Sequence, residues 1–295
     1  MIALVQSLRP KQWTKNLLVF AGVVFSQHAG DRALLLRAAA GVAAFSLLAG
    51  TVYLVNDLRD VESDRQHPKK RLRPVASGRL EPGVAWAAVP VLLAAVAAIA
   101  AWLGPGFAGV LAAYLTTNLA YSFGLKHHVI LDVFMIAAGF VLRAAAGVEL
   151  LKPVAPETQL SPWLLVCTFF GALFLAVSKR RREMATAGGG ASDQRAVLAA
   201  YTPELLDRML TIAATSTLMS YALYTIWPAT VAKFGTEALL VTVPVVAYGV
   251  FRYLHLVRVS ETSEDPSAVL LADRPIQATL AVYVALTLWI LYNRR

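Results

Sequence analysis

Apolar runs long enough to cross a lipid bilayer recur along the whole of this 295-residue chain. A membrane-spanning helix needs about 20 predominantly apolar residues. Apolar residues make up 58% of the sequence, against about 45–50% in a typical soluble domain. The sequence therefore predicts an all-α polytopic membrane protein that forms one integral membrane domain over residues 1–295. We expect about nine transmembrane helices, near residues 14–29, 33–56, 84–103, 106–124, 129–150, 161–179, 204–229, 236–257 and 275–292.

The basic residues are divided unequally between the two sets of loops. The segment before the first span and the long inserts near residues 57–83, 180–203 and 258–274 hold most of them. The opposite loops hold only Arg32, Arg37, Lys152, Lys233, Arg294 and Arg295. The positive-inside rule places the N-terminus and the inserts in the cytoplasm, as a cap of loops on a multi-pass protein of a bacterial-type inner (cytoplasmic) membrane. The net charge of +9 then reports cytoplasmic loops, and we expect no nucleic-acid partner.

An acidic motif from Asn56 to Asp64 ends the second apolar run. If the helix continues through the motif, Asp57, Asp60 and Asp64 share one face. Oxygen ligands suit Mg²⁺, which usually links protein carboxylates to substrate phosphates. The alternative is a solvated helix end with helix-spaced charges. Because acidic residues at a membrane boundary are costly without a cation, the motif favours a metal–diphosphate site.

Several cations are candidates for binding phosphate. Arg73 precedes a proline, which favours extended backbone, and its guanidinium suits bidentate phosphate contacts. Lys126 closes the fourth span and is either a phosphate ligand or a snorkelling anchor. Lys179 and Arg180 end the sixth span, in position to face the same site.

Two ionisable residues lie within the fifth span. Asp132 and Arg143 share a helix face about 16 Å apart, too far to pair directly. An arginine at this depth faces a cavity, binds an anion or bonds to another helix. Near the last span, Asp273 is expected to cap the helix, with Pro275 in its first turn.

The motif N-D-x-x-D-x-x-x-D, followed by R-P-x-x-S-G from Arg73 to Gly78, resembles the UbiA-type superfamily of intramembrane prenyltransferases. Tyr121, Ser122 and Lys126 match as well. The resemblance extends along essentially the whole chain and implies a helical bundle around a central cavity, capped by cytoplasmic loops. It also implies that Asp57, Asp60 and Asp64 hold Mg²⁺ and act in catalysis.

The chain departs from the usual pattern after the sixth span. Aromatic prenyltransferases of the superfamily carry a second motif, D-x-x-x-D, where this chain has Lys179-Arg180-Arg181-Arg182-Glu183. The segments 9–16, 121–126 and 265–275 resemble the phosphoribosyltransferase branch. That resemblance implies transfer of 5-phosphoribose from 5-phosphoribosyl 1-diphosphate to polyprenyl (decaprenyl) phosphate, in the synthesis of arabinan precursors for the cell wall. The residues assigned to substrate binding are Lys15, Asn56, Arg73, Tyr121, Lys126, Arg143, Lys179 and Arg180.

Two other functions stay open at this point. One is transfer of a polyprenyl group from its diphosphate to an aromatic acceptor, which the missing second acidic motif disfavours. The other is a transporter or lipid-binding protein that uses Asp132 and Arg143 as an intramembrane site, although no inverted repeat is visible. The protein could form a homo-oligomer under any of these three functions.

Overall fold

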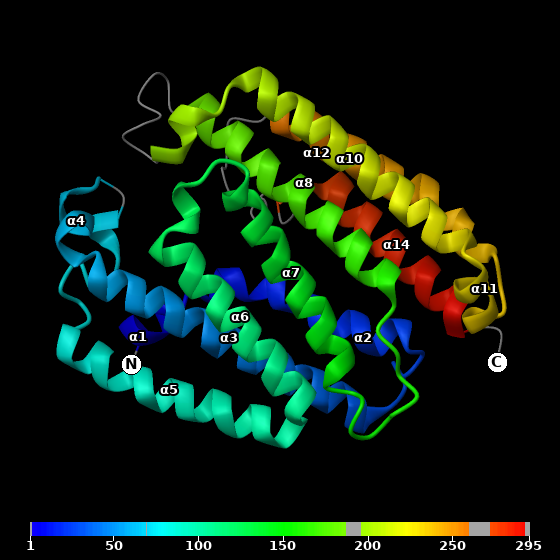
Figure 1. Cartoon of the computed structure of the whole chain (residues 1–295), viewed down its shortest axis with the longest axis horizontal. Coiled ribbons are helices and arrows are strands. Elements are labelled where there is room, and N and C mark those ends of the chain that lie inside the picture. The colour runs from blue at the N-terminus through cyan, green and yellow to red at the C-terminus, as the bar shows by residue number, and fades with distance from the viewer. Residues whose placement is uncertain (1, 69, 187–195, 260–271, 293–295) are drawn as a thin grey trace. The chain divides into compact units, whose positions relative to one another are not determined.

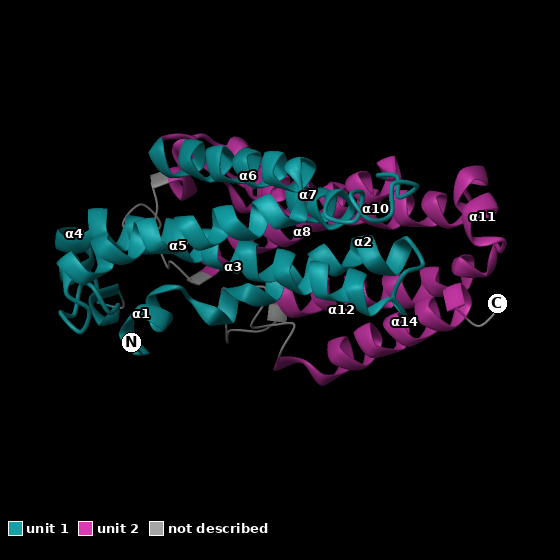
Figure 2. Ribbon diagram, turned by 90° about the horizontal axis from the view of Figure 1, so that it is seen from below, with its two compact units in different colours: residues 1–123, 142–160 teal, residues 124–141, 161–295 magenta. Residues whose placement is uncertain are grey.

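The computed structural model of the chain describes residues 2–68, 70–186, 196–259 and 272–292 (Figure 1). Within these ranges every regular element is a helix, which confirms the all-α prediction. The chain divides into two compact units, shown in different colours in Figure 2. The first contains residues 1–123 and 142–160, and the second contains residues 124–141 and 161–295. Parts of the predicted cap segments, with Lys69 and Asp265, lie outside the described residues.

The first unit contains most of the N-terminal helices. Its elements are α1 (Ile2–Ser7), the 3₁₀ helix η1 (Pro10–Val19), α2 (Phe20–Phe25), α3 (Arg32–Arg59), α4 (Val61–Gln66), η2 (Lys70–Leu72), α5 (Pro82–Leu103), α6 (Pro105–Phe123) and the second half of α7 (Leu131–Glu149). The Asp31 side chain accepts hydrogen bonds from the backbone at Ala33 and Leu34 and so caps the long helix α3. Helix α3 packs along α5 and carries the acidic motif at its end.

Close contacts of small residues bring the first unit together. A Cβ at Gly147 would lie 2.2 Å from the Val19 carbonyl oxygen, and one at Gly22 would lie 1.9 Å from that of Gly147. Only glycine allows α2 and α7 to approach this closely, as in other membrane helix crossings. Arg37 donates to the carbonyls of Leu150 at 2.8 Å and Leu103 at 2.6 Å, which satisfies two helix ends with one guanidinium.

The second unit contains the first half of α7 and the C-terminal helices. Its other elements are η3 (Leu125–His127), α8 (Pro162–Thr186), η4 (Ala196–Ala200), α10 (Pro203–Ile226), α11 (Pro228–Phe234), η5 (Ala238–Thr242), α12 (Val243–Val259) and α14 (Arg274–Tyr292). Helix α10 lies along α8 (Figure 1). The Ile276 amide donates to the Asp273 side chain at 2.9 Å, which confirms that Asp273 caps the last helix.

Seven helices among the described residues are long and apolar enough to cross a membrane. They are Arg32–Arg59, Pro82–Leu103, Leu131–Glu149, Pro162–Ala185, Pro203–Ile226, Ala238–Arg258 and Arg274–Tyr292. The multi-span prediction is confirmed, whereas the count of nine is not. The segment expected near residues 14–29 consists of η1 and the six-residue α2. Helix α6 is long enough, but Thr116, Thr117 and Asn118 lower its mean hydropathy.

Candidate active site

The acidic motif lies where α3 ends and α4 begins. Asp57 is in the last turn of α3, Asp60 separates the two helices, and Asp64 is in α4. The helix is therefore interrupted at Asp60, where φ is −95° and ψ is 11°, and a single continuous helix through all three aspartates is not formed. Asp60 is exposed, whereas Asp57 and Asp64 are each only 2% exposed. A simple solvated helix end does not describe these two buried carboxylates.

Asp57 and Asp64 converge on one guanidinium nitrogen. Arg73 Nη1 donates to Asp57 Oδ1 at 3.1 Å and to Asp64 Oδ2 at 2.6 Å. Asp57 lies at the C-terminus of α3, where the partial negative charge of the helix opposes a carboxylate, so this buried group needs a cation. Arg73 supplies it, and its own side chain stays 28% exposed. The structure thus places Arg73 beside the aspartates, with the carboxylates as its partners, and its predicted contact with phosphate stays a prediction.

Arg9 is a site residue that sequence reasoning missed. Its Nη2 donates to Asp57 Oδ1 at 2.7 Å, and its guanidinium lies 4.5 Å from the ring centroid of Tyr53. The Arg9 backbone is left-handed, with φ 53° and ψ 64°, a conformation that costs about 1–2 kcal/mol outside glycine. The sequence did contain a signal, because Tyr53 and Asp57 are four residues apart on a helix and present one surface to a partner.

The aspartates have the donor set that Mg²⁺ prefers. In the part of the chain that the structure describes, no three His, Cys, Asp or Glu side chains gather to hold a metal ion. An all-protein metal cage is therefore not formed here. Mg²⁺ instead usually takes one or two carboxylates and completes its shell with substrate phosphates and water. Asp57 and Asp64, which already share a cation, fit this arrangement, and the metal roles of Asp57, Asp60 and Asp64 all stay predictions.

The other predicted residues of the first unit lie on three elements. Asn56 Nδ2 donates to Ser122 Oγ at 3.4 Å, which connects the ends of α3 and α6. Tyr121 is half-buried on α6, one residue before Ser122. Lys15 is half-buried on η1 and donates to the Gln12 side chain. Their substrate contacts stay predictions.

Arg143 has the contacts of a residue that joins helices. It is 7% exposed and donates to Asn16 Oδ1 and to Tyr114 OH, each at 2.7 Å. Asn16 in turn donates to Ser46 Oγ at 2.9 Å. These contacts connect α7 with η1, α6 and α3. They support the interhelical alternative, and phosphate binding by Arg143 stays a prediction.

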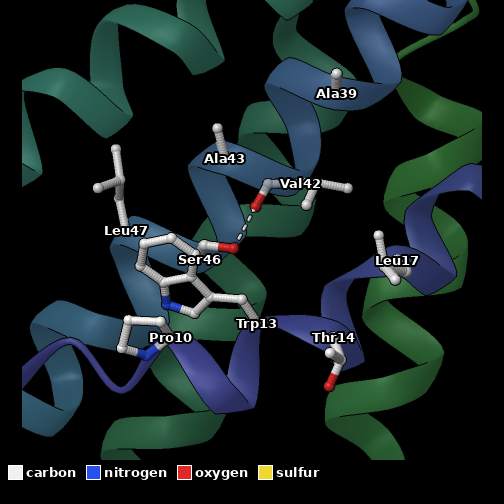
Figure 3. A pocket seen from close by; sticks show the side chains of 9 residues that line it. All are labelled: Pro10, Trp13, Thr14, Leu17, Ala39, Val42, Ala43, Ser46 and Leu47. Atoms are coloured by element: carbon white, nitrogen blue, oxygen red, sulfur yellow. Dashed lines mark hydrogen bonds between the residues drawn. The ribbon is translucent and has the colours of Figure 1, made fainter. Parts of the chain in front are cut away.

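An apolar cavity of about 490 Å³ lies between η1 and α3 (Figure 3). Its lining residues are Pro10, Trp13, Thr14, Leu17, Ala39, Val42, Ala43, Ser46 and Leu47. Ser46 Oγ donates its hydrogen bond to the Val42 carbonyl at 2.7 Å, so the wall presents mainly apolar surface and few free hydrogen-bonding groups. Such a cavity suits an apolar chain.

The remaining predicted cations belong to the second unit. Lys126 is half-buried on η3, and Lys179 lies 3.8 Å from Glu183. Arg180 is completely buried, and its Nε donates to Asp132 Oδ2 at 2.6 Å. The side chain of Arg180 has no exposed surface and its partner is a carboxylate, so contact between Arg180 and phosphate stays a prediction.

Comparisons with known proteins identify relatives of this chain. Residues 16–292 match the UbiA prenyltransferase family. The decaprenyl-phosphate phosphoribosyltransferase of Mycolicibacterium smegmatis is 39% identical over 225 residues, which cover 75% of this chain and 69% of the relative. The enzyme of the same name from Corynebacterium glutamicum is 37% identical over 244 residues, which cover 80% and 70%.

Solved structures share the fold. A UbiA homolog from Archaeoglobus fulgidus, bound to GPP and Mg²⁺, matches with a TM-score of 0.72 and covers 98% of this chain and 99% of that one. The sequence identity is 19%, so this likeness concerns the fold alone. It confirms the expected UbiA-type helical architecture.

Proposed function

Because this chain belongs to the UbiA prenyltransferase family, we propose that it transfers 5-phosphoribose from 5-phosphoribosyl 1-diphosphate to a polyprenyl phosphate in a Mg²⁺-dependent reaction. The named relatives are decaprenyl-phosphate phosphoribosyltransferases that match most of the chain. The observation that carries the proposal is the position of Arg73 Nη1 between two buried carboxylates. This cluster supplies oxygen ligands for a metal and a cation for phosphate at one point.

The reaction needs little proton transfer. A phosphate oxygen of the lipid is already anionic near neutral pH, so it attacks the anomeric carbon without a strong general base. The bond from that carbon to the diphosphate oxygen breaks, and the diphosphate leaves with the electron pair. Positive charge develops on the sugar as in other glycosyl transfers. Mg²⁺ would neutralise the leaving group when bound.

Each residue of the cluster has a distinct role in this proposal. Asp57 and Asp64 hold the metal, Asp60 contributes its charge to the same metal site from the exposed break between α3 and α4, and Asn56 orients the site. Arg73 and Arg9 turn from the carboxylates to phosphate oxygens, which their partly exposed side chains permit. Guanidinium groups suit this exchange because they form parallel hydrogen bonds to carboxylate and phosphate alike. Lys15, Tyr121, Lys126 and Lys179 complete the proposed substrate contacts.

The lipid acceptor explains the membrane setting. A polyprenyl tail needs apolar surroundings, and the cavity between η1 and α3 offers apolar walls. We further propose that the acidic motif faces the cytoplasm, where the water-soluble sugar diphosphate enters, in a bacterial inner membrane. The basic residues near the motif support this orientation through the positive-inside rule. The arabinan-precursor pathway is the proposed context.

The test is a transfer assay with purified protein. Radiolabelled phosphoribosyl diphosphate, decaprenyl phosphate and Mg²⁺ should yield a labelled, organic-extractable lipid and free diphosphate. Omitting Mg²⁺ in the presence of a chelator should abolish the product. Failure to form a lipid-linked product would refute the proposal. Formation of a prenylated aromatic compound from a polyprenyl diphosphate would support the alternative transferase instead.

A further inference from the structure

A buried hydrogen-bond network lies at the start of α7 in the second unit. The Tyr201 hydroxyl donates to Asp132 Oδ1 at 2.6 Å, and Arg180 Nε donates to Asp132 Oδ2 at 2.6 Å. Asp132 and Arg180 have no exposed surface, and Tyr201 is 4% exposed. Nothing in the proposed reaction uses these residues directly.

The network continues into the backbone of Ile130. Its N–H donates to the Tyr201 hydroxyl oxygen at 2.7 Å. Ile130 has a φ of 70°, which is left-handed and unusual for a β-branched residue. Its side chain is 44% exposed, so packing gives little compensation for this strain. The hydrogen bond that the Ile130 amide donates to Tyr201 is therefore a main contact that holds the conformation.

Ile130 ends the loop that carries Lys126. In this loop, the His127 amide donates to the Gly124 carbonyl at 3.0 Å, and the Asp132 amide donates to the His128 carbonyl at 3.1 Å. The short helix η3 and the first turn of α7 are thus joined through Ile130. A change of φ at Ile130 would redirect the whole loop, because only two residues separate it from η3.

We propose that Tyr201, Asp132 and Arg180 are positioning residues that hold Ile130 in its left-handed conformation and thereby direct Lys126 toward an anionic substrate. This inference rests on the proposed function only for the identity of that substrate, a sugar diphosphate. Local strain held by surrounding contacts is characteristic of functional loops.

The chemistry of Tyr201 fits this task. Its hydroxyl accepts from a backbone amide and donates to a carboxylate at once, so it must stay protonated. Burial, followed by the hydrogen bond to Asp132, raises the pKa of the Tyr201 hydroxyl above its usual value. Arg180 balances the charge of Asp132 and fixes that carboxylate. A buried ion pair contributes little to stability compared with apolar replacements, so a positioning role explains its presence better.

The decisive variant is Tyr201→Phe, which keeps the ring and removes both hydrogen bonds. The matched control is Tyr221→Phe, because Tyr221 is also buried in the second unit and its hydroxyl is hydrogen-bonded to the Thr242 hydroxyl at 2.6 Å. Loss of one hydrogen bond corresponds to roughly 2–10-fold in an equilibrium constant. We expect Tyr201→Phe to raise the KM for phosphoribosyl diphosphate about 5–10-fold with a smaller change in kcat.

Two further readouts separate positioning from mere stability. Hydrogen exchange of the amides at residues 125–130, read by mass spectrometry, should accelerate in Tyr201→Phe and stay unchanged in Tyr221→Phe. Adding Ile130→Asn to Tyr201→Phe should lower the KM most of the way back to the wild-type value, because asparagine adopts the left-handed conformation more readily. This rescue is not expected if Tyr201 acts only through packing.

The outcomes distinguish this inference from the proposed function. Equal melting-temperature losses in both variants, with no change in exchange or KM, would overturn the inference. Faster exchange with an unchanged KM would show that the loop does not direct the substrate, which also overturns it. If the wild-type protein forms no lipid product, the proposed function fails. The inference is then tested by binding: the dissociation constant of phosphoribosyl diphosphate is compared between Tyr201→Phe and Tyr221→Phe in place of the KM.

Discussion

The two units each contain a cluster of aspartates and arginines, and the clusters differ in the exposure of their cations. In the first, Arg9 and Arg73 are 32% and 28% exposed and contact an aspartate that is 2% exposed. In the second, Arg180 and Asp132 are both completely buried. The acids are similar, so the difference lies in whether water reaches the guanidinium groups.

This difference separates a site that exchanges partners from a network that does not. A partly exposed arginine turns toward an incoming phosphate at small cost, since water solvates it on the way. A completely buried arginine loses its partner only at a large desolvation cost. The contrast supports the proposed substrate binding at the cluster around Asp57 and the proposed positioning role of the network around Asp132.

The largest effect is expected from Asp132→Ala, which leaves Arg180 buried without its main partner. Breaking a buried ion pair on one side costs about 3–5 kcal/mol. Because Arg180 Nη1 still contacts Glu183 at 2.5 Å, we expect the lower end, about 3 kcal/mol. Thermal unfolding in detergent measures it. The double variant Asp132→Leu, Arg180→Met should recover most of the lost stability. An unchanged melting temperature in Asp132→Ala would contradict the contrast between the partly exposed arginines near Asp57 and the buried Arg180.

The opposite pattern is expected from Asp57→Asn. This change should leave the melting temperature nearly unchanged, since Arg9 and Arg73 have access to water. Transfer should nevertheless fall about 100–1,000-fold, the range for losing a key electrostatic contact. Initial rates at saturating lipid measure it. Transfer at the wild-type rate would remove Asp57 from the mechanism.

A smaller loss of turnover is expected from Asp60→Asn, because Asp60 lies at the exposed break between α3 and α4. We expect about a 10-fold decrease if its charge acts on the site from the periphery, which corresponds to about 1.4 kcal/mol. Circular dichroism should show an intact fold. Full activity would exclude Asp60 from the reaction.

Arg73→Ala should have two opposite effects. Without the guanidinium between the carboxylates, Mn²⁺ should bind several-fold more tightly in the absence of substrate, as measured by electron paramagnetic resonance. The KM for phosphoribosyl diphosphate should rise about 10-fold, because a charged hydrogen bond of about 1.5–3 kcal/mol is lost. Arg65→Ala is the matched control, since Arg65 pairs with the exposed Glu62. Weaker Mn²⁺ binding in Arg73→Ala would contradict competition between arginine and metal.

The smallest effect is expected from salt. Raising ionic strength screens exposed charges far more than buried ones. The KM for the sugar diphosphate should therefore rise modestly between low and high salt, while hydrogen exchange at residues 125–130 stays constant. A salt-sensitive exchange rate would mean that water reaches the network around Asp132.

The sequence predicted the chemistry of the first cluster better than its geometry. The apolar runs indicated a multi-span helical protein, and the position of Asp273 before Pro275 indicated a helix cap, since both are local patterns. The sequence also placed Arg73 with the acidic motif. It missed the break at Asp60, because helix propensity alone does not show at which residue the backbone dihedral angles leave the helical range.

Long-range pairing explains which contacts the sequence did not predict. Arg9 pairs with Asp57, and Arg180 pairs with Asp132, in each case across 48 positions. No local spacing indicates such partners. Four consecutive basic residues after a span look alike in sequence, yet Arg180 points into a buried network while Lys179 keeps 37% of its side chain exposed.

The most direct test of the central claim is an experimental structure with Mg²⁺ and phosphoribosyl diphosphate bound. We expect the metal between Asp57 and Asp64 in contact with the sugar's diphosphate, Arg73 turned onto a phosphate oxygen, and Arg180 still on Asp132. A structure with the diphosphate bound elsewhere, or with Arg73 Nη1 unmoved between the two carboxylates, would contradict the account.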